Sequence, residues 1–421
     1  MDLLRFITCG SVDDGKSTLI GRLLYDSKSI LADQLEAVER ASKSRDQNAG
    51  ADGKVDLALL TDGLRSEREQ GITIDVAYRY FQTTARKFII VDAPGHIQYT
   101  RNMVTGASNC QLAIVLIDAR HGVVEQTRRH SLIASLLGLQ HIVVAVNKMD
   151  LVGFSQDVFS NICIQYAALA QKLSVPDITY IPISALHGDN VVDRSSAMNW
   201  YDGPTLLHHL ETITLHDQTD LSQGRFPVQL VIRPQTAELP DYRGYAGKVT
   251  SGTFRVGEAV TVLPSGETST ISRIETNETD VPEATVNQSV ILHLADDVDV
   301  SRGDLLVPSA TQPVVSQTVA AMLCWMDTKT MSVGSKYLLQ VGTARTRCVV
   351  REIPYRLNIE TYEHVPDVER LKLNDLARVV LKTAQPIAFD PYPQNRSTGG
   401  AILIDETSNV TVGALMLQEA S

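Results

Sequence analysis

Residues 10–17, which read Gly-Ser-Val-Asp-Asp-Gly-Lys-Ser, constrain the fold of this chain more than any other stretch. An apolar run precedes them at residues 3–9, and apolar residues with helical spacing follow them. The order of strand, G-x-x-x-x-G-K-S loop and helix is typical of a phosphate-binding loop, whose glycines let backbone N–H groups approach the phosphates. The alternative is a glycine-rich turn with an incidental lysine, and the flanking patterns disfavour it. The residues predicted to surround the phosphates are Gly10, Ser11, Val12, Asp13, Asp14, Gly15, Lys16, Ser17 and Thr18.

Two side chains of this loop have distinct expected roles. We expect the Lys16 ammonium to reach the β- and γ-phosphates and to take part in catalysis. We expect the Ser17 hydroxyl to bind Mg²⁺, because this ion prefers oxygen ligands and is normally shared with the phosphates. The loop therefore predicts a nucleotide site that works with magnesium.

Length and composition narrow the classes of protein to consider. A chain of 421 residues is too long for one ordinary core, so two or three domains are expected. The 38 basic and 49 acidic residues give a net charge of −11, which argues against a broad nucleic-acid surface. Five scattered cysteines without C-x-x-C spacing predict neither a zinc site nor a disulfide framework. With no signal peptide and no apolar run of about 20 residues, we expect a cytoplasmic protein without a membrane segment.

The first half of the chain, residues 1–217, has the pattern of an α/β domain. Apolar strands alternate with helices, which predicts a mainly parallel sheet covered on both faces. Ligands of such sheets bind at the carboxyl ends of the strands. The expected strands are residues 3–9, 76–82, 88–91, 112–117, 142–146 and 179–183, and the expected helices include residues 127–137 and 154–173.

A polar insertion at residues 26–70 ends in the stretch Arg-Glu-Gln-Gly-Ile-Thr-Ile at residues 68–74. One interpretation is a solvated surface excursion. The other is a switch that orders around the nucleotide, in which the Thr73 hydroxyl completes the Mg²⁺ shell and its N–H meets the γ-phosphate. We predict both metal binding and a catalytic contact for Thr73.

The strand at residues 88–91 leads into an Asp-Ala-Pro-Gly-His box at residues 92–96. Asp92 is predicted to reach Mg²⁺ through water, and the Gly95 N–H to approach the γ-phosphate. A lone histidine is often structural, but His96 follows the γ-phosphate contact directly, so we predict that it orients the attacking water. The box adds Asp92, Ala93, Pro94, Gly95 and His96 to the predicted site.

The base of the nucleotide is predicted by an N-K-x-D box after the strand at residues 142–146. A carboxylate such as Asp150 accepts hydrogen bonds from the ring N–H and the amine of guanine, but would face an acceptor on adenine. Asn147 can tie neighbouring loops together, and backbone N–H groups near Ala185 can contact the guanine carbonyl. The predicted guanine site comprises Asn147, Lys148, Met149, Asp150, Ser184, Ala185 and Leu186, so the expected ligand is GTP or GDP.

After about residue 220, short β-rich segments separated by turns replace the helical patterns, which predicts two antiparallel β-barrels at residues 225–309 and 313–421. The linkers are expected near residues 216–225 and 308–314. The barrels show no catalytic constellation in the sequence. Their expected strands include residues 226–233, 245–251, 259–263, 270–275, 290–294, 319–325, 337–341, 346–353, 376–381 and 400–404.

The boxes G-x-V-D-x-G-K-S, G-I-T-I, D-x-P-G-H and N-K-x-D, in this order, resemble those of translational GTPases of the elongation factor Tu type. Further stretches resemble the large GTPase subunit of bacterial sulfate adenylyltransferase, and the similarity covers nearly the whole chain. These stretches are residues 4–16, 67–81, 98–103 and 408–414.

The resemblance implies that this chain hydrolyses GTP with Mg²⁺ and forms a heterodimer, or a higher oligomer, with a smaller catalytic subunit. That ATP sulfurylase subunit joins ATP and sulfate to give adenylyl sulfate and pyrophosphate. Residues 26–73 and 98–108 are the candidate contacts with the partner, and neither a nucleic-acid nor a membrane partner is expected. Ala93 and Ile97 stand where relatives often have Thr and Glu, which affects the expected communication with the partner. No second phosphate-binding motif follows, so a fused adenylyl-sulfate kinase is either missing from this protein or lies beyond the end of the chain.

Two other functions are compatible with the same plan. A translation factor that delivers an aminoacylated RNA has the same three domains, but it needs a basic surface that the acidic composition disfavours. A GTP-dependent assembly protein would hydrolyse GTP without regard to ATP and sulfate.

Overall fold

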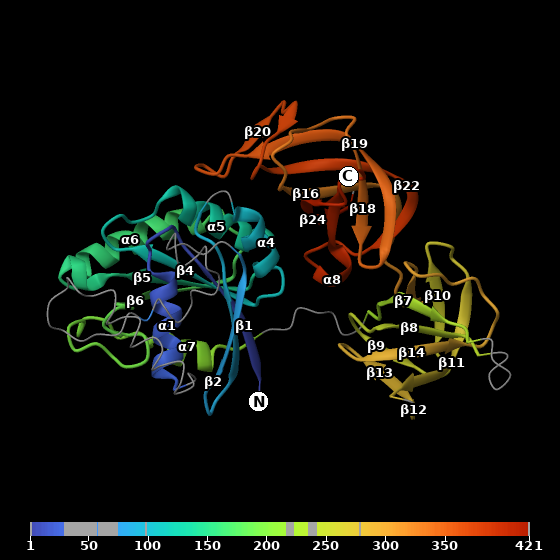
Figure 1. Ribbon diagram of the computed structural model, residues 1–421, viewed down its shortest axis with the longest axis horizontal. Helices are drawn as coiled ribbons and strands as arrows, with labels where there is room; N and C mark the ends of the chain where they lie inside the picture. The colour runs from blue at the N-terminus through green and yellow to red at the C-terminus, as the bar shows by residue number, and fades with distance from the viewer. Residues whose placement is uncertain are drawn as a thin grey trace. The chain divides into compact units, whose positions relative to one another are not determined.

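The computed structural model describes residues 2–28, 57, 75–96, 99–215, 223–234, 242–277 and 279–419. The chain divides into two compact units, Met1–His216 with Ile359–Tyr362, and Asp217–Asn358 with Glu363–Ser421 (Figure 1). Thr73, Ile97, most of the predicted insertion and most of the first predicted linker lie outside the described residues. The predicted division into three domains stays a prediction.

The first unit contains a sheet of six strands in the order β2-β3-β1-β4-β5-β6. All neighbours pair in parallel except β2, which runs antiparallel to β3. The predicted mainly parallel sheet is therefore confirmed. The strands are β1 (Leu3–Cys9), β2 (Ala77–Gln82), β3 (Lys87–Asp92), β4 (Leu112–Asp118), β5 (His141–Asn147) and β6 (Asp177–Pro182).

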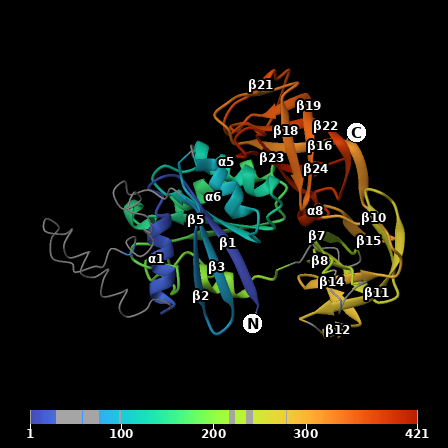
Figure 2. The ribbon, with the colours of Figure 1, turned by 45° about the vertical axis from the view of Figure 1, so that its right-hand side comes forward.

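Helices cover both faces of this sheet (Figure 2). On one face, α1 and α7 share a buried core with strand residues such as Phe6 and Phe88. On the other face, Gly106 of α4 lies so close to β3 that a Cβ there would approach Val91 Cγ1 to 2.7 Å. The helices are α1 (Lys16–Asp26), α4 (Thr100–Ala107), α5 (Glu125–Leu136), α6 (Gln156–Ala170) and α7 (Leu206–Thr212), with a 3₁₀ turn at Met149–Val152.

Helix α6 is shorter than the predicted range of residues 154–173. Phe154 has a φ of 55°, outside the helical region, and the Ser155 hydroxyl then caps the helix by accepting a hydrogen bond from the Val158 N–H. At the other end the α-helical hydrogen bonds give way to a 3₁₀-type turn, in which the Leu173 N–H donates to the Ala170 carbonyl three residues back. Local caps at the two ends, rather than the apolar pattern, set the length of this helix.

The second unit contains two antiparallel barrels, as predicted. In the first barrel, the order β10-β15-β7-β8-β14-β11 closes through pairing of β11 with β10. In the second, the order β18-β23-β24-β16-β22-β19 closes through pairing of β19 with β18. Closure leaves few unpaired strand edges.

The strands of the first barrel region are β7 (Phe226–Ile232), β8 (Gly244–Lys248), β9 (Thr253–Arg255), β10 (Ala259–Leu263), β11 (Thr268–Thr276), β12 (Thr279–Val281), β13 (Glu283–Thr285), β14 (Ser289–Leu294) and β15 (Leu305–Pro308). Those of the second are β16 (Val314–Trp325), β17 (Met331–Ser332), β18 (Lys336–Val341), β19 (Ala344–Leu357), β20 (His364–Pro366), β21 (Arg370–Leu371), β22 (Leu376–Phe389), β23 (Gly400–Ile404) and β24 (Thr411–Gln418), with the short helix α8 (Arg396–Gly399). Each barrel has its own buried apolar core.

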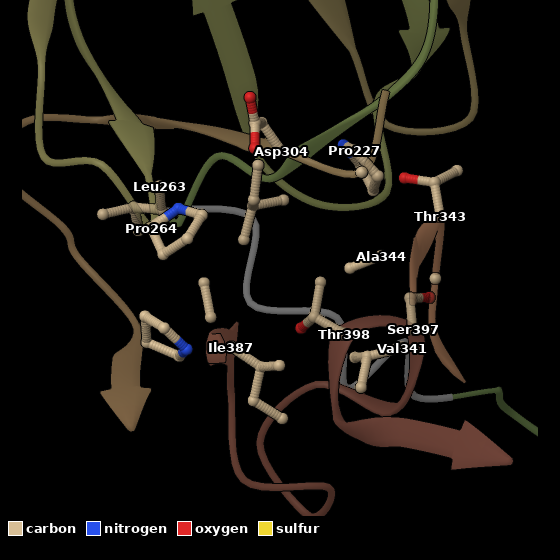
Figure 3. A pocket seen from close by; sticks show the side chains of 15 residues that line it. Pro227, Leu263, Pro264, Asp304, Val341, Thr343, Ala344, Ile387, Ser397 and Thr398 are labelled. Atoms are coloured by element: carbon tan, nitrogen blue, oxygen red, sulfur yellow. The ribbon is translucent and has the colours of Figure 1, made fainter. Parts of the chain in front are cut away.

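A cavity of about 50 Å³ lies in the second unit, lined by residues of both barrels (Figure 3). Its walls include Pro227, Leu263 and Asp304 of the first barrel, and Thr343 and Ile387 of the second. A cavity of this size can hold water but is far too small for a nucleotide.

Among the helices that the structure describes, none has the length and apolar character needed to cross a membrane.

Candidate nucleotide-binding site

The predicted phosphate-binding loop connects the end of β1 to the start of α1 at Lys16. Gly15 has a φ of 91°, and a Cβ at this position would lie 2.4 Å from the Asn147 side-chain nitrogen. Only glycine satisfies both conditions. Asp13, with a φ of 68°, also adopts the left-handed conformation that gives the loop its tight bend.

Hydrogen bonds inside the loop fix its shape. The Ser11 N–H donates to the carboxylate of Asp14, a side chain whose burial raises its pKa. Lys16 Nζ donates to the Gly10 carbonyl at 3.0 Å and to the Ser11 carbonyl at 2.7 Å. Burial lowers the pKa of Lys16, with Asp92 and Asp14 opposing the shift. The ammonium thus lies against the loop carbonyls, where incoming phosphate oxygens can replace them as its partners.

Strand β3 brings the Asp-Ala-Pro-Gly-His box to the same loop. Asp92 is 2% exposed and pairs in register with Thr8, whose hydroxyl donates to Asp92 Oδ1 at 3.4 Å. A Cβ on Gly95 would lie 2.5 Å from Lys16 Nζ, so the backbone of Gly95 packs directly against the loop. Gln126 Nε2 on α5 holds the Gly95 carbonyl at 2.9 Å. The predicted γ-phosphate contact is therefore next to the predicted phosphate-binding lysine.

His96 follows Gly95 and is partly buried. Its ring lies beside that of Tyr99, with the centroids 6.0 Å apart. This position, one residue from the backbone that meets the loop, is compatible with the predicted role in orienting water. The catalytic role of His96 stays a prediction, and that of Thr73 concerns a residue outside the described part.

Asn147, at the end of β5, joins three loops. Its Nδ2 donates to the Asp14 carbonyl at 2.8 Å, and its Oδ1 accepts from the Ala185 N–H at 2.9 Å. The side chain is 2% exposed, so these bonds form in a poorly solvated environment. One amide therefore fixes the phosphate loop relative to the turn after β6.

Asp150 and Ser184 form the expected base pocket. Ser184 Oγ donates to Asp150 Oδ1 at 2.7 Å, and His187 Nε2 lies 3.8 Å from Asp150 Oδ2. A carboxylate has lone pairs beyond those used here, so Asp150 keeps acceptor capacity for a guanine edge. Met149 and Ala185 are buried, whereas Leu186 is 55% exposed.

Lys148 connects the base side of the site to a residue that the sequence analysis missed. With a φ of 62°, it places Nζ against the Asp13 carbonyl and 3.0 Å from Asp118 Oδ2. Burial alone would raise the pKa of Asp118, but hydrogen bonds from Arg120 and Lys148 hold it below the usual range. Asp118 ends the buried strand β4 at the ligand edge of the sheet, and that position was the available signal.

The donor set fits a magnesium ion. Ser17 supplies a hydroxyl in the first turn of α1 and Asp92 a carboxylate, both oxygen ligands of the kind that Mg²⁺ prefers. Within the described ranges no group of three or more His, Cys, Asp or Glu side chains could hold a metal.

Comparisons with known proteins agree with this site. Residues 1–222 match the elongation factor Tu GTP binding domain, and residues 318–418 match the GTP-eEF1A C-terminal domain-like family. Sulfate adenylyltransferase subunit 1 of Cellvibrio japonicus is 55% identical over 99% of this chain and 87% of that protein, and that of Aeromonas hydrophila is 53% identical over 99% and 86%. The bifunctional enzyme CysN/CysC of Mycobacterium tuberculosis is 53% identical over 99% of this chain, which spans 67% of that protein. This chain belongs to the sulfate adenylyltransferase subunit 1 family of elongation-factor-Tu-type GTPases.

Proposed function

We propose that this chain is the GTP-hydrolysing subunit of a sulfate adenylyltransferase and regulates the formation of adenylyl sulfate. The observation that carries the proposal is 55% identity to a sulfate adenylyltransferase subunit 1 over 99% of the chain. The geometry supports the GTP part, because Asn147 fixes the phosphate loop beside the Asp150 and Ser184 pair.

In the proposed reaction, Lys16 exchanges its two loop carbonyls for the β- and γ-phosphates. Ser17 and Thr73, with Asp92 through water, would hold Mg²⁺, and the bound ion would neutralise charge that develops on the phosphates. The Gly95 N–H contacts the γ-phosphate, and His96 orients water in line with it. Asp150 accepts from guanine and excludes adenine.

The partner is proposed to be the smaller subunit that joins ATP and sulfate to adenylyl sulfate and pyrophosphate. Coupling requires that the partner's reaction and the GTP or GDP state bias a shared conformational equilibrium. Residues 26–73 and 98–108 are the proposed contacts. The first segment includes Thr73 and the second follows His96 closely in the sequence, so a partner bound to them would sense hydrolysis.

The test is GTP hydrolysis by this chain mixed with the candidate catalytic subunit, with and without ATP plus sulfate, while adenylyl sulfate is followed. We expect each reaction to rise only when the other's substrates are present. Hydrolysis that ignores ATP and sulfate but responds to ribosomes or aminoacylated RNA would overturn the proposal.

A further inference from the structure

Arg22 on α1 holds the backbone of the turn that follows β6. Its Nε donates to the Ala185 carbonyl at 3.3 Å, and its Nη2 donates to the Leu186 carbonyl at 2.7 Å. Nη1 lies 3.5 Å from Asp26 Oδ1 on the same helix, and the side chain is 19% exposed. The helix that begins at the phosphate loop therefore also anchors the turn beside the expected base pocket.

Most N–H groups of this turn are already used. Those that donate within the protein belong to Ser184, Ala185, His187 and Gly188. In the part of the chain that the structure describes, the Leu186 N–H has no acceptor. An N–H without a protein partner in a half-exposed turn is available to a ligand.

The bond that Arg22 makes to Ala185 determines where this free N–H points. The Ala185 carbonyl and the Leu186 N–H belong to one peptide unit, which is planar and trans. In such a unit the C=O and N–H bonds point in opposite directions. Because Arg22 holds the oxygen on the side of α1, the N–H is directed away from α1. The second bond, to the Leu186 carbonyl, fixes the next peptide unit in the same way.

We propose that Arg22 is a positioning residue for base recognition, which orients the Leu186 N–H to donate to the 6-oxo group of guanine. The proposal rests on the proposed guanine site. It is supported by the Ser184 bond to Asp150, which places the turn beside the carboxylate expected to bind the opposite part of the guanine edge. A donor at this position favours a 6-oxo purine, whereas the 6-amino group of adenine would present a second donor to it.

The test compares the affinities of the full chain for GDP, inosine diphosphate and ADP, measured by displacement of a fluorescent GDP. In Arg22→Met, which keeps a long side chain but loses its donors, we expect GDP and inosine diphosphate to bind about tenfold more weakly. Both ligands carry the 6-oxo group, so both lose the same contact. ADP lacks that group, and its weak binding should stay the same. The rate of GTP hydrolysis at saturation should change less than about twofold, because the phosphate contacts are elsewhere.

Arg194→Met is the matched control. Arg194 Nη2 also donates to two successive carbonyls of the same unit, those of Asp202 at 2.8 Å and Gly203 at 3.0 Å. We expect its loss to leave the GDP to ADP preference unchanged. Arg22→Lys, which keeps the charge but offers one donor group instead of a fork, should weaken GDP binding by a smaller factor than Arg22→Met.

The outcomes separate this inference from the proposed function. An unchanged GDP to ADP preference in Arg22→Met, or an equal loss for all three nucleotides, would overturn the role of Arg22. A wild-type chain without preference for GDP over ADP would overturn the guanine site itself. If Arg22→Met does not fold, as judged by circular dichroism, the same comparison in Arg22→Lys decides the question.

Discussion

The Arg225 guanidinium in the second unit and the Lys16 ammonium in the first are both buried, yet only Arg225 uses its full set of donors. Arg225 is 0% exposed and makes five hydrogen bonds, each 2.8 or 2.9 Å long. Lys16 donates to two loop carbonyls, which leaves one of its three N–H groups without an acceptor among the described residues. The acceptors around Arg225 are the two Asp390 oxygens, the Gly224 and Thr311 carbonyls and Gln223 Oε1.

The groups around these two cations differ as well, although Thr311 Oγ1, on the residue whose carbonyl accepts from Arg225, is also buried without a hydrogen-bond partner among the described residues. Asp390 also accepts from the Thr398 hydroxyl at 2.6 Å, so the pair around Arg225 is closely satisfied. Near the nucleotide site, Gln126 Oε1 and His130 Nδ1 are buried without a hydrogen-bond partner among the described residues. Leaving a buried polar atom unpaired costs about 1–3 kcal/mol. A network whose polar groups all have hydrogen-bond partners stabilises one conformation. A network with unpaired polar groups can form further hydrogen bonds, either to a ligand or in a second conformation.

The largest expected effect comes from removing His96 from the incompletely satisfied site. His96→Ala should slow GTP hydrolysis by about 10²–10⁴-fold, the usual contribution of a positioned acid–base group, with GTP affinity and thermal stability almost unchanged. Single-turnover hydrolysis and equilibrium GTP binding measure the two effects. His208→Ala removes an exposed histidine of the same unit and serves as the control. Normal turnover in His96→Ala would exclude His96 from the mechanism.

Removing Arg225 from the satisfied network should produce the opposite pattern. Arg225→Met leaves Asp390 buried without its cation and should lower the free energy of unfolding by about 3–5 kcal/mol. Denaturant titration of the transition assigned to the second unit measures the loss. Arg347→Met, which removes an ion pair between Arg347 (76% exposed) and Glu406, should cost less than about 1 kcal/mol. A similar cost for both variants would show that the buried pair contributes no more than a surface pair.

Asn147 lies in the nucleotide site, yet both ends of its amide are hydrogen-bonded as in a structural network. Its replacement therefore tests whether one residue contributes both to stability and to nucleotide binding. Asn147→Ala removes both bonds that join the phosphate loop to the turn after β6, so GDP affinity should fall about tenfold or more. Asn395 of the second unit is also buried and bonded through both ends of its amide, to Ser251 Oγ and to the Ser397 N–H. Asn395→Ala should lower stability comparably without changing GDP affinity. Isothermal titration with GDP, paired with thermal unfolding, distinguishes the two.

The residues of the nucleotide site were predicted from the sequence far better than the buried network around Arg225. The loop at residues 10–17 and the Asn147 box depend on local spacing at strand ends, and the structure brings both boxes together. Arg225 and Asp390 are 165 positions apart, and only the three-dimensional packing of the second unit makes them neighbours. The role of Arg22 was missed for a similar reason. Nothing in the helical pattern of α1 distinguishes it from other polar residues, and the carbonyls that it binds lie more than 160 positions away in the sequence.

The smallest expected effect concerns His130 on α5, whose buried ring titrates in an acidic range. Burial, followed by the nearby Lys16 and Arg129 charges, lowers its pKa to about 3. Below about pH 6.5 the unfolded state therefore binds a proton that the folded state does not, so stability falls as the pH falls from 6.5 towards 3. The slope from this group approaches about 1.4 kcal/mol per pH unit within that window.

His130→Leu should make the decline in unfolding free energy between pH 6.5 and 5 shallower, by about 1.6 kcal/mol over the interval, even if the variant is less stable at pH 7. Chemical denaturation at several pH values measures the slope. His208→Ala, which removes an exposed histidine of the same unit, is the control and should leave the slope as in the wild type. An identical slope in His130→Leu would mean that His130 binds its proton equally well in the folded and the unfolded protein, which would contradict the lowered pKa.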